Sequence, residues 1–169
     1  MAIRPIPLSE LETVGRGLKN PVGVAVDREG RLWASDPESA VVWVKPDGGV
    51  KRLGKAGGAP NGIAIDAHNR AVIANLGLAV GAPGPLQRVH LSSGELETLC
   101  DAVDGRPLTA STHPAIKGDD TIYCTHSSWA STLSSALDAR RDDGFIYRVD
   151  RKGNATTVTQ GLSPSPISC

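Results

Sequence analysis

The stretch PVGVAVDREGRLWASD at residues 21–36 returns about 39 residues later as PNGIAIDAHNRAVIANLG at residues 60–77. Both copies read Pro, any residue, Gly, aliphatic, Ala, aliphatic, Asp, and both continue through a turn into a second short apolar run. Two short apolar runs joined by a turn that contains Gly or Asn are typical of a β-hairpin. The sequence therefore predicts a fold that is built from repeated hairpins.

A third, more divergent copy begins near Thr112 and runs through the turn at Gly118 to Cys124. Hairpins of a second kind, each with an apolar strand, a Gly-containing turn and a polar strand, lie at residues 41–53, 86–99 and 144–158. Alternation of the two kinds gives a four-stranded unit of roughly 40 to 55 residues, which is typical of a propeller blade. We predict an all-β fold, a partial β-propeller of about three to three and a half four-stranded blades. Only residues 129–141 have apolar residues at helical spacing, so a short helix or lid loop is expected there.

The composition excludes several classes of partner and site. The 169 residues include 18 Lys and Arg and 18 Asp and Glu, so there is no basic field to hold nucleic acid or an anionic membrane. No apolar run approaches the ~20 residues of a membrane span, and the N-terminal segment lacks the apolar core of a signal peptide, so a cytoplasmic location is expected. Three cysteines without CxxC spacing argue against a disulfide framework and a zinc site; they are Cys100, Cys124 and Cys169.

The order of these segments resembles the N-terminal half of the SMP-30/gluconolactonase family. The resemblance covers the chain from about Leu18 to Leu162 and rests on both copies quoted above and on residues 96–128 and 143–162. Its most specific part is DGRPL at residues 104–108, followed by a hairpin that ends in Tyr-Cys-Thr. The resemblance implies a six-bladed propeller, a central divalent cation, often calcium or zinc, and hydrolysis of sugar lactones or related esters.

The chain departs from the family at each expected ligand. The family has a metal-binding Glu near the start of the first blade, where residues 19–22 read Lys-Asn-Pro-Val here, and a substrate-contacting Asn where Thr112 and His113 stand here. The family's next ligand is an Asn in a Pro-Asn-Gly motif, where this chain has Ser-Pro-Ser-Pro at residues 163–166. The family's last ligand, an Asp of the fifth blade, corresponds to a position beyond Cys169. The change at this point predicts a truncated or frame-shifted gene. The expected organisation is an N-terminal extension (1–17), an incomplete propeller (18–163) and a tail foreign to the family (164–169).

A few polar residues are candidates for a site. Thr112, His113 and His126 are the predicted substrate-binding residues. The resemblance implies this for Thr112 and His113, which can still donate hydrogen bonds there, and the two imidazoles at the mouth of a channel can bind a metal or shuttle protons, with structural histidines as the alternative. Asp36 and Asn75 end strands and are the candidate metal ligands, with turn capping as the alternative. The catalytic residues are unknown from the sequence.

Two further motifs have a simple structural explanation. Asn61, in Pro-Asn-Gly, resembles the ligand motif of the family, but a turn that leads into a strand with positive φ is the alternative. Ser127 and Ser128 follow His126, yet no Gly-x-Ser-x-Gly elbow supports a serine hydrolase.

Three functions fit these observations. The first is a lactonase by descent. Its full-length relatives hydrolyse a small-molecule lactone with a divalent cation, calcium or zinc, and this chain is expected not to bind that cation and to be inactive. The second is a non-catalytic propeller fragment for binding, or for self-association through open blade edges. The third is a non-functional product of truncation.

Overall fold

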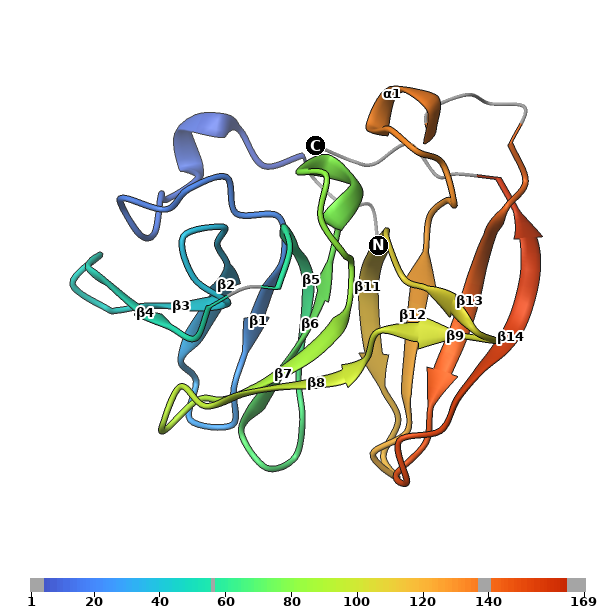
Figure 1. Ribbon diagram of the computed structural model, residues 1–169. Coiled ribbons are helices and arrows are strands. Elements are labelled where there is room, and N and C mark those ends of the chain that lie inside the picture. The colour runs from blue at the N-terminus through green and yellow to red at the C-terminus, as the bar shows by residue number, and fades with distance from the viewer. Residues whose placement is uncertain (1–4, 56, 137–140, 164–169) are drawn as a thin grey trace.

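Antiparallel strands make up nearly all of the regular secondary structure in the computed structural model, which describes residues 5–55, 57–136 and 141–163 (Figure 1). The described residues form three four-stranded sheets, each with its strands in chain order, which we call blades 1, 2 and 3. Blade 1 consists of β1 (Val24–Val26), β2 (Leu32–Ser35), β3 (Val41–Val44) and β4 (Val50–Leu53). Blade 2 consists of β5 (Pro60–Ile65), β6 (Arg70–Asn75), β7 (Leu86–His90) and β8 (Leu96–Cys100). Blade 3 consists of β11 (Ser111–Ile116), β12 (Ile122–His126), β13 (Gly144–Val149) and β14 (Ala155–Leu162).

Short elements connect the blades. A small two-stranded sheet, β9 (Ala102–Val103) and β10 (Arg106–Pro107), precedes blade 3. Helical turns occur at η1 (Leu8–Glu10), η2 (Gly77–Ala79) and α1 (Leu133–Ala136), and α1 falls inside the segment where a short helix was expected. The predicted all-β partial propeller and both kinds of hairpin are therefore confirmed. The described residues hold three blades and no strand of a fourth, and the predicted tail (164–169) lies outside them, so the domain boundaries stay predictions.

The first two strands of each blade pair at equivalent positions of the repeat. Val24 pairs with Ala34 in blade 1, Ile63 with Ile73 in blade 2, and Pro114 with Cys124 in blade 3. The Asp that closes the repeated motif caps the turn between the first two strands. Asp27 Oδ1 accepts bonds from the amides of Glu29 and Arg31, both at 2.9 Å, and Asp66 Oδ1 does the same for His68 and Arg70 at 2.8 and 3.0 Å. These bonds satisfy turn amides that no strand can pair, which explains why Asp ends the motif.

The blades pack side by side, with the innermost strand β5 in contact with both β1 and β11. One apolar core fills the space between blades 1 and 2, and another fills the space between blades 2 and 3. Trp33 anchors the first core and Tyr147 the second, and both are almost fully buried. Burial of one large apolar side chain contributes about 1.5–3 kcal/mol, so these two cores hold the arc of blades together.

The Gly of the repeated motif lies where the backbones of successive blades meet. A Cβ on Gly23 would lie 2.7 Å from the carbonyl oxygen of Asn61, and a Cβ on Gly62 would lie 2.4 Å from that of Thr112. Asn61 and Gly62 lie inside β5 and neither has a positive φ, so the expected turn into the strand is wrong. Gly stands there because no other side chain leaves room for the neighbouring backbone.

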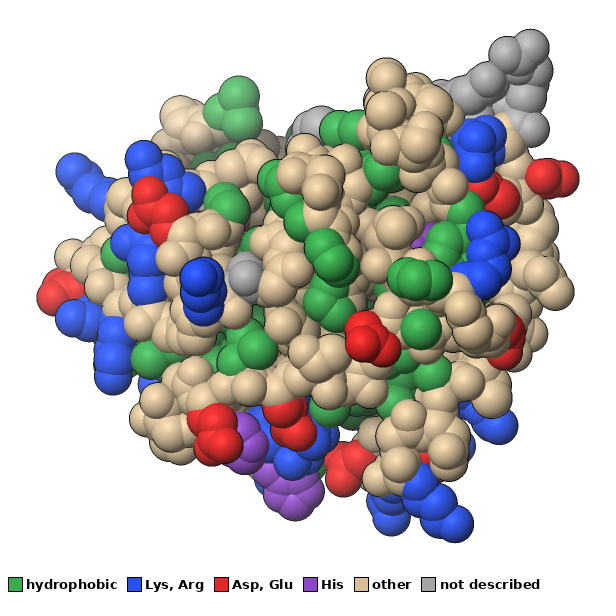
Figure 2. All heavy atoms as spheres, in the orientation of Figure 1, with side chains coloured by type: hydrophobic (Ala, Val, Ile, Leu, Met, Phe, Trp, Pro, Cys, Tyr) green, Lys and Arg blue, Asp and Glu red, His purple; other side chains and the backbone are tan. Residues whose placement is uncertain are grey.

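The N-terminal segment, residues 5–18, crosses the outer strands of blade 1. The Arg16 amide donates to the carbonyl of Gly48 at 3.1 Å, and the Arg52 guanidinium donates to the carbonyl of Gly17 at 2.7 Å. Figure 2 shows acidic and basic side chains interspersed over one face of the molecule, as the zero net charge leads one to expect. No helix in the described part of the chain is long and apolar enough to cross a membrane.

Candidate functional site

The candidate site is the end of the arc where the three innermost strands begin. The repeat places Val22, Asn61 and Thr112 at the same position in blades 1, 2 and 3, one residue before the position of the junction glycines. The third blade has His113 at the glycine position. At this position polar side chains come from blades 2 and 3, whereas blade 1 has the apolar Val22.

Thr112 and His113 meet at one hydroxyl. Thr112 Oγ1 lies 2.7 Å from Thr125 Oγ1, and the His113 amide donates to the same oxygen at 3.1 Å. The Thr112 side chain is buried, whereas His113 is exposed. Of the predicted substrate-binding residues, His113 is therefore the one whose side chain faces solvent.

His126 has a different environment. It is 1% exposed, and its Nε2 accepts bonds from the amides of Thr109 and Ala110 at 3.3 and 3.1 Å. Its ring packs against Trp129 and Phe145, with centroids 4.2 and 4.7 Å apart. Burial lowers the pKa of His126 to about 4, the nearby Asp143 opposes this shift, and Arg106 adds to it. A neutral ring with the proton on Nδ1 fits these bonds, since Nε2 must accept.

The structure does not bring the predicted site residues together as a set. Thr112 and His113 share Thr125, but no hydrogen bond among the described residues joins either of them to His126. In the β11–β12 ladder His126 pairs with Ser111. His126 thus fastens the segment that leads into blade 3.

Asp36 and Asn75 occupy the position of His126 in blades 1 and 2, two residues beyond Ala34 and Ile73. Both are fully buried. Asp36 accepts bonds from the amides of Lys19 and Glu38 at 3.0 and 2.8 Å and from Arg52 at 3.2 Å. These donors surround the carboxylate, which agrees with the capping alternative more closely than with a metal ligand.

Asn75 uses its amide nitrogen to fasten the loop that follows β6. Its Nδ2 donates to the carbonyl of Pro85 at 2.9 Å and to Gln87 Oε1 at 3.1 Å. Its Oδ1 is buried without a hydrogen-bond partner, and so is Oδ1 of Asn61. Among the residues that the structure describes, no group of three or more His, Cys, Asp or Glu is placed to hold a metal ion.

The loop that joins β12 and β13 is held by a carboxylate that the sequence did not single out. Asp143 accepts bonds from Ser128 Oγ at 2.9 Å and from the Trp129 amide at 3.0 Å, and it also pairs with Arg141. Burial raises the pKa of Asp143, but the bonds from Arg141, Ser128 and Trp129 outweigh it and hold the pKa below its usual value. Ser128 therefore serves this loop, and no bond links it to His126.

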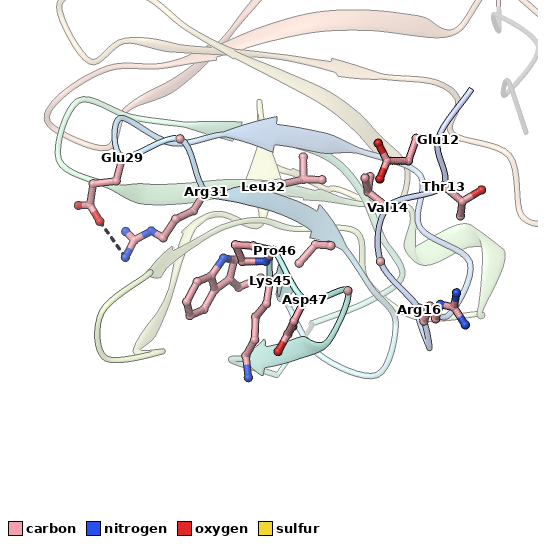
Figure 3. A pocket seen from close by; sticks show the side chains of 15 residues that line it. Glu12, Thr13, Val14, Arg16, Glu29, Arg31, Leu32, Lys45, Pro46 and Asp47 are labelled. Atoms are coloured by element: carbon pink, nitrogen blue, oxygen red, sulfur yellow. Dashed lines mark ion pairs between the residues drawn. The ribbon is translucent and has the colours of Figure 1, made fainter. Parts of the chain in front are cut away.

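Two pockets are lined by residues outside the innermost strands β1, β5 and β11. A pocket of about 230 Å³ is bordered by Arg106, Trp129, Phe145 and Asp143, with the Arg106 guanidinium 4.1 Å from the centre of the Trp129 ring. A second pocket, of about 480 Å³, lies between the N-terminal segment and blade 1 (Figure 3). There the ion pair of Arg31 with Glu29, at 2.9 Å, forms part of the wall. Neither pocket could be predicted, because each depends on segments that are remote in sequence.

Comparison with known proteins supports the fold. No model of a known protein family matches the sequence, and no curated protein matches it. Three similar solved structures are a protein described as a gluconolactonase, a gluconolactonase from Xanthomonas campestris, and a PQQ-bound aldose sugar dehydrogenase from Streptomyces coelicolor. Their TM-scores are 0.64, 0.65 and 0.60 at sequence identities of 14%, 19% and 20%.

The matches cover 88%, 85% and 85% of this chain but 51%, 48% and 48% of the solved structures. The chain thus spans about half the length of these proteins, which agrees with a resemblance to one half of a gluconolactonase-like fold. At these identities the likeness shows the fold alone. A lactonase and a dehydrogenase on one fold illustrate why the fold does not fix the reaction.

Proposed function

We propose that this chain forms half of an SMP-30/gluconolactonase-like propeller, the family whose activity is metal-dependent hydrolysis of sugar lactones. The observation that supports this most directly is the overlap of the three blades with about half of two gluconolactonase structures. The DGRPL segment agrees with it, since it leads into blade 3 through β10 as the resemblance implies. The substrate class in this proposal is a small lactone, and the proposed location is the cytoplasm.

We further propose that the three blades alone do not hydrolyse lactones. A calcium ion takes six to eight oxygen ligands and favours carboxylates, and zinc requires at least three protein ligands in a catalytic site. The end of the arc where the innermost strands begin offers Asn61 Oδ1, which has no hydrogen-bond partner, and a Thr112 hydroxyl that is already bonded to Thr125. No carboxylate occurs at residues 19–22, and Asp36 is surrounded by its own donors. A calcium or zinc ion does not fit these residues, so no step of a reaction is assigned to one.

A non-catalytic binding role is the second candidate function. It is favoured by the unpartnered Asn61 Oδ1, which can accept a bond from a ligand hydroxyl, and by the exposed His113 beside it in the next blade. Buried acceptors of this kind are normally satisfied, so an unsatisfied one marks a place where a ligand or water can bind.

A lactonase assay tests the main proposal. The purified chain is incubated with gluconolactone, and acid release is followed with a pH indicator. Three samples of the protein are compared: untreated, treated with a chelator, and supplied with calcium or zinc. The expected rate equals that of the protein-free blank in all three conditions. The Xanthomonas campestris gluconolactonase serves as the positive control. Activity that the chelator abolishes and the cation restores would contradict the proposed inactivity.

A further inference from the structure

A group of packed aromatic rings borders the pocket of about 230 Å³ beside blade 3. The Trp129 ring lies at 18° to that of Phe145, with centroids 5.3 Å apart, and its centroid is 4.2 Å from that of His126. Phe145 and His126 are 5% and 1% exposed, so the core holds both of these rings in place. The Trp129 ring, which packs on them, therefore has a well-defined position at the edge of the pocket.

Arg106 lies against this ring and has no hydrogen-bond acceptor of its own. Its guanidinium carbon is 4.1 Å from the centroid of Trp129, within the range of a cation–π contact. In the described part of the chain, no hydrogen bond or ion pair engages this guanidinium. A guanidinium that contacts a ring through its face keeps its N–H groups, which point outward in its plane, for an acceptor. This group is suited to bind a carboxylate through two hydrogen bonds.

Three carboxylates line the same pocket, and two of them are not neutralised by a cation. Asp143 is paired with Arg141. Asp104 accepts one bond from a hydroxyl at 2.6 Å, and Asp142 has no side-chain hydrogen bond or ion pair to any described residue. Neither Asp104 nor Asp142 forms an ion pair with Arg106 in the described structure, although all three line one pocket. Opposite charges that line a pocket without meeting are complementary to a molecule that carries one charge of each sign.

The walls of the pocket set the size of a ligand. Its volume is below the roughly 300 Å³ at which pockets for drug-sized ligands begin. Val103, Phe145 and Trp129 provide apolar surface on which a short carbon skeleton can pack. The whole lining comes from blade 3, the loop between β12 and β13, and the β9–β10 sheet, and β9 contacts β14 (Figure 1). The pocket therefore fits one small molecule with an apolar part.

Ligands with a single kind of charge satisfy only part of this pocket. A simple anion can bind Arg106, but it meets the negative charges of Asp104 and Asp142. A simple amine can bind the two carboxylates, but it meets the positive charge of Arg106 and leaves the guanidinium without an acceptor. A molecule with both a carboxylate and an ammonium group pairs with all three side chains.

We infer that this pocket binds a small zwitterion, with a carboxylate and an ammonium group on a short apolar skeleton, such as an amino acid. The carboxylate accepts bonds from Arg106, the ammonium group donates to Asp142 and Asp104, and the skeleton packs on Trp129. Asp104 and Arg106 come from the DGRPL segment. The inference does not rest on the proposed lactonase relationship, because no residue of the pocket belongs to an innermost strand.

Nuclear magnetic resonance of the indole N–H signals tests the inference at the pocket itself. The chain has three Trp residues, and the Trp129 signal is the one that Trp129→Phe removes. L-Valine and γ-aminobutyrate are the probes, because they place the same two charges at different separations. At least one of them is expected to shift the Trp129 signal to saturation and to leave those of Trp33 and Trp43 in place. The methyl ester and the N-acetyl form of that probe each lack one charge and are expected to bind at least ~10-fold more weakly.

Variants of the charged residues assign each charge of the probe to its partner. In Arg106→Gln the probe and its methyl ester are expected to bind equally, because the carboxylate has lost its partner. In the double variant Asp104→Asn, Asp142→Asn the probe and its N-acetyl form are expected to bind equally. Arg148→Gln and Asp101→Asn are the matched controls, since both residues are exposed and lie outside the pocket, and they are expected to bind like the parent. Circular dichroism establishes that every variant is folded.

Several results would overturn the inference. One is a Trp129 signal that neither probe shifts, and another is a shift confined to Trp33 or Trp43. Binding of the methyl ester or the N-acetyl form as tight as that of the probe would show that the pocket does not read both charges. Acetate or glucose that binds as tightly as the probe would assign the pocket to an anion or to an uncharged polar ligand instead. Equal losses of affinity in the control variants and the pocket variants would place the binding elsewhere.

Discussion

Blades 1 and 3 have the same strand order, but different side chains hold the segment that leads into the innermost strand of each. At the position that follows the second strand, blade 1 has the carboxylate of Asp36, which holds the Lys19 amide at 3.0 Å. Blade 3 has the ring of His126, which holds the Thr109 and Ala110 amides through Nε2. In both blades a buried acceptor ties down the segment that leads into the innermost strand.

The comparison shows that the residue at this position serves as a buried hydrogen-bond acceptor for backbone amides. An acidic residue in one blade and an imidazole in another look like metal ligands in a sequence, because both residue types bind metals. In the structure both residues accept bonds from backbone amides of the segment that precedes the innermost strand, and Asp36 also accepts bonds from the Glu38 amide and the Arg52 guanidinium. Removing either acceptor leaves buried donors unsatisfied, which is the basis of the predictions that follow.

The largest effect is expected for Asp36→Ala. The change removes the acceptor of two amides and leaves the Arg52 guanidinium without this partner, so the free energy of unfolding is expected to fall by about 3–5 kcal/mol. Chemical denaturation at neutral pH measures it. Asp47→Ala is the matched control, because Asp47 accepts one amide in an exposed turn. An equal loss of unfolding free energy in the two variants would show that Asp36 does not anchor this segment.

A pH titration sharpens the contrast between the two anchors. His126 has a folded pKa of about 4 against an ordinary value of 6.5, so the unfolded chain binds more protons between these values. Stability is fully present above pH 6.5 and falls as the pH drops towards 4, by about 3 kcal/mol from this residue. Asp27 and Asp143 keep their full stabilising contribution above pH 3.8 and lose it only below that pH, because their folded pKa values are lowered from 3.8.

His126→Gln keeps an acceptor but removes the titration. The variant is expected to be less stable than the parent at pH 7, and the difference is expected to shrink as the pH falls from 6.5 to 4. Thermal or denaturant unfolding at a series of pH values measures both curves. Parallel curves across this window would show that His126 is not held neutral by its surroundings.

The smallest effects concern the hydroxyls one position earlier. Ser35 Oγ accepts the amides of Val22 and Gly23 at 3.2 and 2.9 Å and is buried, whereas Thr125 is partly exposed. Ser35→Ala is expected to cost about 1 kcal/mol and Thr125→Val less, because water can replace the bond that the exposed amide of His113 loses. Blade 2 has Ala74 here and folds without a hydroxyl. A greater loss in the Thr125 variant would reverse this order.

The repeats and hairpins could be predicted because their signals are local. The two-residue period, the Gly and Asn turns and the Asp that caps them all act within a few residues, and Asp27 bonds to residues two and four positions away. The roles of the junction glycines could not be predicted. Gly62 looks like a turn residue in the sequence, and only the neighbouring blade, about 50 residues later, shows why a side chain cannot fit.

The candidate site was harder to predict for the same reason. His126 was expected beside Thr112 and His113, yet its partners are amides 16 and 17 residues earlier, directly after the DGRPL segment, which does not indicate by itself that the following amides bind a histidine. Asp143 was overlooked because its partners, Ser128 and Trp129, come into range only when the loop folds back. The two unpartnered amide oxygens of Asn61 and Asn75 likewise depend on burial, which a sequence does not reveal.

Proton contacts between successive blades test the central claim, that the innermost strands lie side by side around one axis. The structure predicts a nuclear Overhauser effect between the α protons of Gly62 and the α proton of His113, because a Cβ on Gly62 would lie 2.8 Å from His113 Cα. A similar signal is expected between Gly23 and the amide proton of Ile63. An assigned spectrum that shows the contacts within each hairpin but neither of these would contradict the propeller arrangement.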